Sequence, residues 1–344
     1  MDYTIKSQFL ISFYGKISNN KIVGENMNPP KLAIVIPCFN EEESLPTSLK
    51  KLWDCMENLS NKGKIANESL IFLIDDGSTD KTWEILSEAH KRAPEKVKAI
   101  KFTRNFGNQA AIFAGLKMIK FFDVDAAITI DADLQQDENK IEEFVEKFNE
   151  GYDIVAGVRE NNEEYDFIKK QTSNLFYKLI NWLGVNIKPN HSEFRLVSKK
   201  VLSLLDLYRE NNLFLRGLFY ELGLKTAYIN YSIKERKFGE SKFSFSKLLC
   251  LASSGIVSYS TKPLRIIFFL GLIVAIISFL IWAFTIFVEV ILNHDINAIE
   301  PYEIWESFIS GVQILSIGII GEYVGQILLE VKGRPRFLID KELL

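Results

Sequence analysis

The stretch Ala126-Ala127-Ile128-Thr129-Ile130-Asp131-Ala132-Asp133-Leu134-Gln135 joins an apolar run to closely spaced carboxylates. The apolar run is typical of a buried strand in a parallel sheet. Residues two apart in an extended chain point to the same side, so Asp131 and Asp133 can converge on one point. Two carboxylates that lie so close repel each other unless a proton or a cation sits between them. Oxygen ligands favour Mg²⁺ or Mn²⁺. The alternative interpretation is a solvated acidic turn.

Apolar strands alternate with helical patterns from Leu32 to Gly157. The predicted strands cover residues 32–37, 70–74, 97–102, 126–130 and 153–157. The helical patterns between them end near Leu59, contain Trp83 and Leu86, and cover residues 108–121 and 138–149. Repeated strand–helix units of this kind predict an α/β fold with a doubly wound, mostly parallel sheet.

Pro37 and three aspartates stand where three of these strands end. Pro37 ends the first strand, Asp75 and Asp76 follow the second, and Asp131 follows the strand at residues 126–130. Because doubly wound sheets bind ligands at the carboxyl ends of their strands, we expect these residues to share one crevice. A dehydrogenase would carry Gly-x-Gly-x-x-Gly after the first strand, and that segment has no glycine, so a nicotinamide site is not expected.

Charge and cysteine content narrow the classes of protein. The formal net charge is -3, and no basic face is interleaved with aromatic residues, so we do not expect nucleic-acid binding. Cys38, Cys55 and Cys250 lack the spacing of a metal site, which fits a reducing compartment without disulfides or zinc.

Hydrophobic residues concentrate in the C-terminal third, which we interpret as a membrane module. Ile266 to Val288 is an uncharged run of about 23 residues, long enough to cross a hydrocarbon core of roughly 30 Å. A second segment, from about Trp305 to Leu329, has an uncharged part of about 15 residues, or roughly 22 Å of helix. Lys and Arg flank both segments but are absent from the connection at 293–303. The positive-inside rule therefore places both flanks and the preceding domain in the cytoplasm.

Several ordered motifs resemble those of family 2 glycosyltransferases. The first three are Pro37-x-Phe39-Asn40-Glu41, Asp75-Asp76-Gly77-Ser78-x-Asp80 and Asp131-Ala132-Asp133-Leu134-Gln135. More narrowly, the chain resembles the polyprenyl-phosphate sugar transferases, such as dolichol-phosphate mannose synthase and the bactoprenol-phosphate glucosyltransferases. Later motifs of the same resemblance are Phe176-Tyr177-Lys178-Leu179-Ile180-Asn181, Phe194-Arg195-Leu196, Arg216-Gly217-Leu218, Gly239-x-Ser241-Lys242-Phe243, Gly321-Glu322-Tyr323-x-Gly325 and Val331-Lys332-x-Arg334-Pro335.

The resemblance implies a GT-A-like nucleotide-diphospho-sugar transferase fold and the residues of its sites. The nucleotide sugar would be bound by Pro37, Asn40, Glu41, Asp75 and Asp76. Mg²⁺ or Mn²⁺ would be held by Asp131, Asp133 and Gln135. The acceptor phosphate would be bound by Arg159, Lys169, Ser173, Arg195, Arg236 and Lys242, with Asp131, Asp133 and Arg159 as the catalytic residues.

The implied reaction is an inverting transfer of one sugar from a nucleoside diphosphate to undecaprenyl or another polyprenyl phosphate. UDP-glucose is the first expectation, and GDP-mannose or another UDP-sugar is the alternative. The sequence departs from the family pattern at Gln136, at Glu193 and at Lys169, where an arginine is common. Other hypotheses are a processive polysaccharide synthase, whose Gln-x-x-Arg-Trp motif is absent, and a membrane-bound pseudoenzyme or scaffold.

The chain is predicted to have five parts. Residues 1–30 form a poorly ordered N-terminal extension, and residues 31–240 form the catalytic domain. Amphipathic helices at 241–263 lie on the bilayer surface, followed by two transmembrane helices within 264–331 and a cytoplasmic basic tail at 332–344. We expect an inner-membrane protein with both termini in the cytoplasm, and the resemblance suggests a homotetramer.

Overall fold

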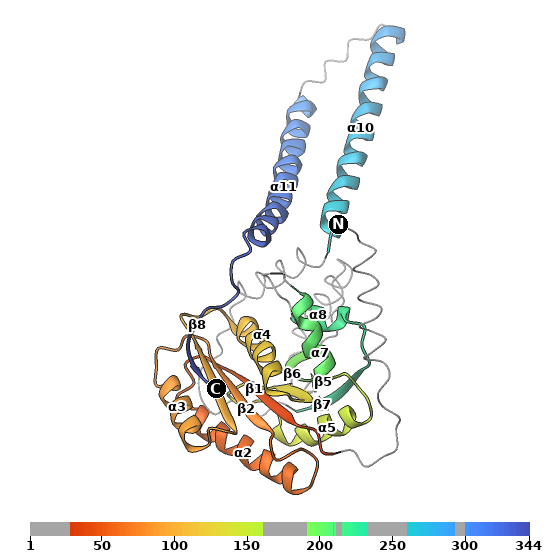
Figure 1. Cartoon of the computed structure of the whole chain (residues 1–344). Coiled ribbons are helices and arrows are strands. Elements are labelled where there is room, and N and C mark those ends of the chain that lie inside the picture. Colours follow the sequence, from red (N-terminus) through yellow and green to blue (C-terminus); the bar gives the residue numbers. More distant parts are fainter. Residues whose placement is uncertain (1–27, 161–190, 209, 211–214, 233–259, 293–299) are drawn as a thin grey trace, which may run out of the picture.

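The computed structural model describes residues 28–160, 191–208, 210, 215–232, 260–292 and 300–344. These residues form an eight-stranded sheet with the strand order β7-β5-β6-β4-β1-β2-β3-β8 (Figure 1). The strands are β1 (Leu32–Cys38), β2 (Leu70–Asp75), β3 (Val97–Phe102), β4 (Ala126–Thr129), β5 (Ile154–Arg159), β6 (His191–Ser198), β7 (Thr226–Tyr231) and β8 (Ile339–Leu343). Only β6 and β8 run antiparallel to their neighbours in this described sheet, so the predicted mostly parallel sheet is confirmed.

Helices cover both faces of the sheet (Figure 1). One face packs against α2 (Leu45–Asn61), α3 (Thr82–Arg92) and α5 (Ile141–Asn149). The other packs against α4 (Asn108–Ile119), α7 (Lys199–Leu204) and α8 (Leu215–Glu221). Short 3-10 helices are η1 (Lys120–Phe122), η2 (Glu138–Lys140) and η3 (Leu205–Leu207). Three layers of this kind are the usual solution for a sheet that is apolar on both faces.

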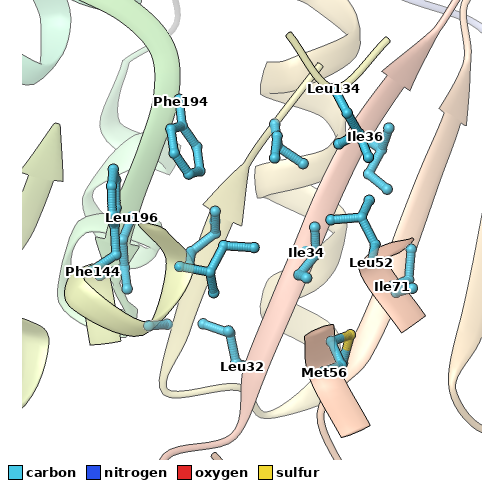
Figure 2. Packing of buried hydrophobic residues seen from close by; sticks show 14 of the residues in the cluster. Leu32, Ile34, Ile36, Leu52, Met56, Ile71, Leu134, Phe144, Phe194 and Leu196 are labelled. Carbon is cyan, nitrogen blue, oxygen red and sulfur yellow. The ribbon is translucent and has the colours of Figure 1, made fainter. Parts of the chain in front are cut away.

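Strand β1 lies at the centre of the sheet and contributes to both cores. Ile34 belongs to the buried cluster beneath α2, which Figure 2 shows, whereas Val35 belongs to the cluster beneath α4. This alternation follows from the two-residue period of a strand. Helix α4 approaches the sheet closely at Gly115, where an added Cβ would lie 2.4 Å from Val35 Cγ1. A side chain at Gly115 would therefore push α4 away from the strands that carry the acidic motifs.

The acidic motifs follow strands on either side of β1, where the strand order reverses. β1 pairs in parallel with β2 on one side and with β4 on the other. The strand order therefore runs from β1 to β2 and β3 on one side and to β4 on the other, and α/β sheets usually bind ligands at the carboxyl ends of the strands at such a point. Asp75 is the last residue of β2, and Asp131 follows β4 at the same edge. The three strands therefore end at one edge of the sheet, and the expectation that these residues share one crevice stays a prediction.

Three strands were not anticipated from the sequence. β6 and β7 come after Gly157, where the last predicted strand ended, and β6 inserts between β4 and β5. β8 lies within residues 332–344, which we expected to be a basic tail, and pairs antiparallel with β3. β8 is an edge strand of the described sheet because it pairs with β3 alone, and of its short polar sequence, Ile339-Asp340-Lys341-Glu342-Leu343, only the two ends are partly buried. Long-range pairing, which a local pattern cannot reveal, decides its conformation.

Long helices occupy both segments that we expected to cross the membrane, α10 (Lys262–Leu292) and α11 (Glu300–Val331). Both project away from the sheet on one side (Figure 1). Within the described residues, one stretch has the length and hydropathy of a membrane-crossing helix, Ile309–Val331, with 23 residues, a mean hydropathy of 1.6 and no buried part. The expected uncharged part of this segment was about 15 residues long, but the stretch continues past Gly321. It includes Glu322, which we expected near the membrane–water interface.

Several expectations concern residues that lie outside the described ranges. They are the N-terminal extension up to residue 27, most of the juxtamembrane segment at 241–263, and the residues Lys169, Ser173, Arg236 and Lys242.

Candidate active site

A tight turn presents the acidic motif at the end of β4. The backbone N–H of Leu134 donates to the carbonyl of Asp131 at 3.2 Å, so the chain turns immediately after the strand. The expectation of an extended chain here was therefore wrong, because β4 ends at Thr129. Burial still alternates: Ala132 and Leu134 are buried, whereas Asp131 and Asp133 are partly exposed.

Leu134 anchors this turn in the protein core. Its φ is 46°, a left-handed conformation that is uncommon for a non-glycine residue. Its side chain is only 4% exposed and belongs to the same buried cluster as Ile36 and Leu52 (Figure 2). Burial of an apolar side chain contributes about 1.5–3 kcal/mol, which offsets the strain of the backbone. The anchored Leu134 thus holds the two carboxylates on the outward side.

Gln136 supports Asp131 from within the fold. Its side chain is 1% exposed, accepts from the Asp131 backbone N–H at 3.3 Å, and donates through Nε2 to Asp131 Oδ2. Burial raises the pKa of Asp131 to about 6; Asp133 and Glu193 add to the rise, whereas Gln136 and Arg159 oppose it. The departure from the family pattern at Gln136 therefore keeps a polar partner on the first aspartate of the motif.

The Asp76 carboxylate is bound by the backbone of the loop between β3 and α4. Oδ1 accepts from the N–H of Phe106 at 2.7 Å, and Oδ2 accepts from the N–H of Gly107 at 2.9 Å. Burial raises the pKa of Asp76 to about 6, although these two N–H groups favour the charged form. Asp76 therefore fixes the position of this loop against the β2 end.

Asp75 is completely buried at the end of β2. Its Oδ1 accepts from the backbone N–H of Ser78 at 2.7 Å, and Lys101 Nζ lies 3.5 Å from Oδ2. Lys101 also donates to the Ser78 carbonyl at 3.2 Å. These contacts hold the turn after β2 in a single shape.

Asn40 and Glu41 join the first loop to the turn after β2. The Asn40 N–H donates to Ser78 Oγ at 3.0 Å, and Asn40 Oδ1 accepts from the Thr79 N–H at 2.9 Å. The N–H of Glu41 donates to Thr82 Oγ1 at 2.9 Å. Pro37 lies beside Ile74 in the pairing of β1 with β2. The residues expected to bind the nucleotide sugar therefore belong to one interlocked pair of loops.

Arg159 and Arg195 occupy different environments. Arg159 ends β5, is partly exposed, and donates through Nε to Tyr231 Oη at 3.3 Å. β5 ends at the same edge of the sheet as β4, with β6 between them, and the positive charge of Arg159 lowers the pKa of Asp131. Arg195 is only 2% exposed, and its guanidinium lies 4.4 Å from the centre of the Phe219 ring. The structure therefore does not favour direct contact between Arg195 and an acceptor lipid.

Glu193 forms a buried polar cluster close to Asp131. Its Oε1 accepts from Arg216 Nε at 2.8 Å and from Gln109 Nε2 at 2.8 Å. Burial opposes ionisation of Glu193, but Arg216 and Arg195 outweigh it and hold its pKa below the usual value. The side chain of Gln109 also accepts from the Leu215 N–H at 3.2 Å, which links α4 to α8.

Comparison with known proteins identifies the family. The family model for glycosyl transferase family 2 matches residues 33–222. The chain belongs to this family. The uncharacterized glycosyltransferase YkoT of Bacillus subtilis is 40% identical over 314 residues, 91% of this chain and 92% of YkoT. The SfII prophage-derived bactoprenol glucosyl transferase of Shigella flexneri is 38% identical over 312 residues, 90% of this chain and 98% of that protein.

Solved structures with a related arrangement are more distant. A mannosyltransferase from Pyrobaculum calidifontis, PcManGT, is 13% identical and matches 76% of this chain and 72% of its own, with a TM-score of 0.43. Glucosyl-3-phosphoglycerate synthase from Mycobacterium tuberculosis is 18% identical and matches 66% of this chain and 78% of its own, with a TM-score of 0.39.

The donor atoms of this family 2 glycosyltransferase fit a hard divalent cation. Asp131 and Asp133 are partly exposed beyond the end of β4, and Gln135, which follows on the same turn, is also partly exposed. Such a set supplies oxygen atoms only and leaves positions for phosphate oxygens and water, as Mg²⁺ sites usually do. Among the described residues, no group of three or more His, Cys, Asp or Glu side chains gathers around one point, so carboxylates beyond this pair do not complete the set.

Some supporting residues of the glycosyltransferase could not be recognised from the sequence. Gln109 and Lys101 look like ordinary helix and strand residues, and only the fold brings them to Glu193 and Asp75. Arg216 belongs to a motif of the resemblance, but its contact with Glu193 was not predicted. Gln136 was noted as a departure from the family pattern, and its position directly after the acidic motif was the available signal.

Proposed function

We propose that this glycosyltransferase transfers glucose from UDP-glucose to undecaprenyl phosphate or a closely related polyprenyl phosphate. The observation that carries the proposal is the 38% identity to a bactoprenol glucosyl transferase over 90% of the chain. That alignment is too long to cover only the sheet domain, so it includes apolar helices as well as the acidic motifs. A second relative, the prophage bactoprenol glucosyl transferase homolog of Escherichia coli, is 36% identical over 90% of the chain.

In this proposal the sugar donor binds across the carboxyl ends of β1, β2 and β4. Asn40, Glu41 and Asp76 shape the pocket for the nucleotide, because their loops are hydrogen-bonded to one another at this edge. Asp131, Asp133 and Gln135 hold Mg²⁺ or Mn²⁺ next to the diphosphate. When bound, the cation stabilises the charge that develops on the leaving nucleoside diphosphate, an effect of several kcal/mol. Leu134 and Gln136 keep both carboxylates in place without reorganisation during the reaction.

The acceptor phosphate attacks the anomeric carbon directly, which inverts its configuration. A phosphate monoester carries about 1.5 to 2 negative charges at pH 7, so its oxygen needs no general base. It does need a cation that brings it close to an equally anionic donor. Arg159 is the described residue that best suits this role, since it is partly exposed and ends β5 at the edge of the sheet where Asp131 follows β4. Lys169, Ser173, Arg236 and Lys242 complete the proposed acceptor site.

The proposed setting is the cytoplasmic face of the inner membrane. Large apolar side chains, among them Phe268, Phe284 and Ile314, are exposed along α10 and α11, as expected for helices in contact with lipid. We propose that both helices cross the bilayer, that the catalytic domain and both termini are cytoplasmic, and that the protein assembles as a homotetramer. Reporters fused after Leu344 and inserted near Lys62 should be cytoplasmic, and a tag near Asn297 should be outside. A cytoplasmic tag at Asn297 would contradict this topology.

A panel of nucleotide sugars tests the reaction itself. Purified protein is incubated with undecaprenyl phosphate and UDP-glucose, GDP-mannose, UDP-galactose or an N-acetylated UDP-sugar, and the glycolipid product is measured. We expect UDP-glucose to give the highest kcat/KM, EDTA to abolish transfer, and added Mg²⁺ or Mn²⁺ to restore it. A different preferred donor would change the sugar assignment only. Absence of transfer with every donor would favour the scaffold role instead.

A further inference from the structure

The last residues of the chain lie against the loop that holds Asp76. We propose that residues 336–343, called here the C-terminal segment, are a positioning part of the nucleotide site. The proposal rests on the proposed function, which places the nucleotide beside Asp76. The segment binds β3, its side chains pack on the residues around the following loop, and that loop binds Asp76.

The backbone of the C-terminal segment extends the sheet at β3. Strand β8 pairs antiparallel with β3, from Leu343 opposite Ala99 to Ile339 opposite Phe102. One residue earlier, the Leu338 carbonyl accepts from the Thr103 N–H at 3.0 Å. The pairing therefore continues past the end of β3 and includes the first residue of the loop at 103–107. In the described sheet β8 pairs with β3 alone, so a displacement of β8 would be felt first by β3 and this loop.

Aromatic rings carry the contact from the segment into the loop. The Phe337 ring stacks on Phe102, with centroids 5.2 Å apart and planes at 14°. Phe102 in turn meets Phe106 edge to face, with centroids 5.7 Å apart. Arg104 lies over the Phe106 ring, with its Cζ 4.1 Å from the ring centre. Offset stacking and edge-to-face packing are the preferred arrangements of aromatic rings, so the series fixes the side chain of Phe106.

Arg336 attaches the same segment to the helix that follows the loop. Its guanidinium lies 4.4 Å from the centre of the Phe113 ring in α4 and donates to the Tyr208 carbonyl at 2.8 Å. The loop at 103–107 connects β3 to α4, and the C-terminal segment contacts both of these elements. Since this segment comes soon after α11, it also connects the apolar helix to the nucleotide site.

The loop itself has little room to move while it holds Asp76. Phe106 and Gly107 donate their N–H groups to the two carboxylate oxygens. On the other side, Gly77 has a φ of 70°, and a Cβ added there would lie 2.3 Å from the Arg104 carbonyl carbon. The loop therefore fits against the turn after β2 in one position, and a shift of Phe106 moves an N–H that Asp76 needs.

The test uses the full chain and compares neighbouring variants. Phe337→Ala removes the stacked ring, and Phe337→Tyr retains it. Leu338→Ala is the matched control, because the Leu338 side chain is 51% exposed and the substitution keeps the carbonyl that binds Thr103. For each protein, UDP affinity is measured by calorimetry, donor and acceptor KM and kcat by glycolipid formation, and backbone exchange by hydrogen–deuterium mass spectrometry.

We expect Phe337→Ala to weaken UDP binding and raise the donor KM at least about fivefold, with kcat and acceptor KM unchanged, since linked sites usually couple by this much or more. The amides at 103–107 should exchange faster, while β1 and β2 stay protected. Phe337→Tyr and Leu338→Ala should behave like the wild type.

Equal losses in donor and acceptor parameters would overturn the proposal, as would unchanged exchange at 103–107 or faster exchange throughout the sheet. The exchange measurement separates this proposal from the proposed function, because it needs no substrate. A wild type that binds no UDP would contradict the nucleotide assignment. Selective loosening of 103–107 in Phe337→Ala would then still support the contact between the segment and the loop.

Discussion

Two acidic pairs lie at the same edge of the sheet, and the fold uses their carboxylates differently. Asp75 and Asp76 are 0% and 3% exposed, and their oxygens contact backbone N–H groups and Lys101. Asp131 and Asp133 lie on a turn beyond β4 and are partly exposed. The first pair therefore joins loops to one another, whereas the second pair remains partly exposed to solvent.

The contrast shows that the residue after each pair decides its role. Gly77 allows the loop at 103–107 to come close enough for its N–H groups to reach Asp76. Leu134 instead enters the core and turns the neighbouring carboxylates outward. Similar sequences at the ends of two strands thus produce a structural anchor in one case and a candidate metal site in the other.

The largest effect is expected at the outward pair. Asp133→Asn removes a ligand charge but keeps the shape of the side chain, so turnover should fall by at least about two orders of magnitude. Thermal stability should change little, within about 0.5 kcal/mol, because Asp133 is partly exposed. Glycolipid formation and a melting curve measure the two effects.

Asp137→Asn is the matched control for this prediction. It removes a nearby negative charge, yet its oxygen can still accept from the Asn139 N–H as the Asp137 carboxylate does. Near-normal turnover of Asp133→Asn in excess Mg²⁺ would contradict the metal assignment. An equal loss in Asp137→Asn would show that the local charge matters and not a specific ligand.

A smaller and different effect is expected at the inward pair. Asp76→Ala leaves the N–H groups of Phe106 and Gly107 without their acceptor, which costs about 1–3 kcal/mol of folding free energy. Nucleotide affinity should fall with it, because the loop loses its anchor. Chemical denaturation and UDP calorimetry measure these losses. Glu43→Ala removes an exposed acid from the first loop and serves as the control. Unchanged stability in Asp76→Ala would mean that the two carboxylate contacts do not hold the loop.

The smallest effect is a pH dependence of stability at Asp76. Its pKa is raised to about 6 by burial, above the usual value of 3.8. A group with a raised pKa in the folded state contributes most below its unfolded pKa, and that contribution is lost as pH rises through about 6. The difference in melting temperature between wild type and Asp76→Ala should therefore be larger at pH 5 than at pH 7.5. A difference that shrinks on acidification would mean that the ionised, hydrogen-bonded form is the more stabilising one.

The local pattern predicted the first half of the sheet well. Strand β3 was predicted with its observed bounds, and β1, β2 and β4 differ by one residue at one end. β1, β2 and β4 are largely apolar runs buried on both faces, so their hydrophobicity identifies them, whereas β3 also contains the partly exposed Lys98 and Lys101. β6 and β8 contain alternating or polar residues, and their pairing with β4 and β3 decides their structure. A local pattern carries little information on such long-range pairing.

The sequence by itself determined the family, the strand ends that carry acids, and the residues that we propose hold the cation and the nucleotide. Those features depend on local order along the chain, which motifs and hydrophobic runs record directly. Only the tertiary structure decided that Arg195 is buried against Phe219, that Gln136 supports Asp131, and that the C-terminal segment packs on β3. Each of these contacts joins residues through a turn, a rotamer or a sheet edge, and such geometry arises only when the whole chain is packed.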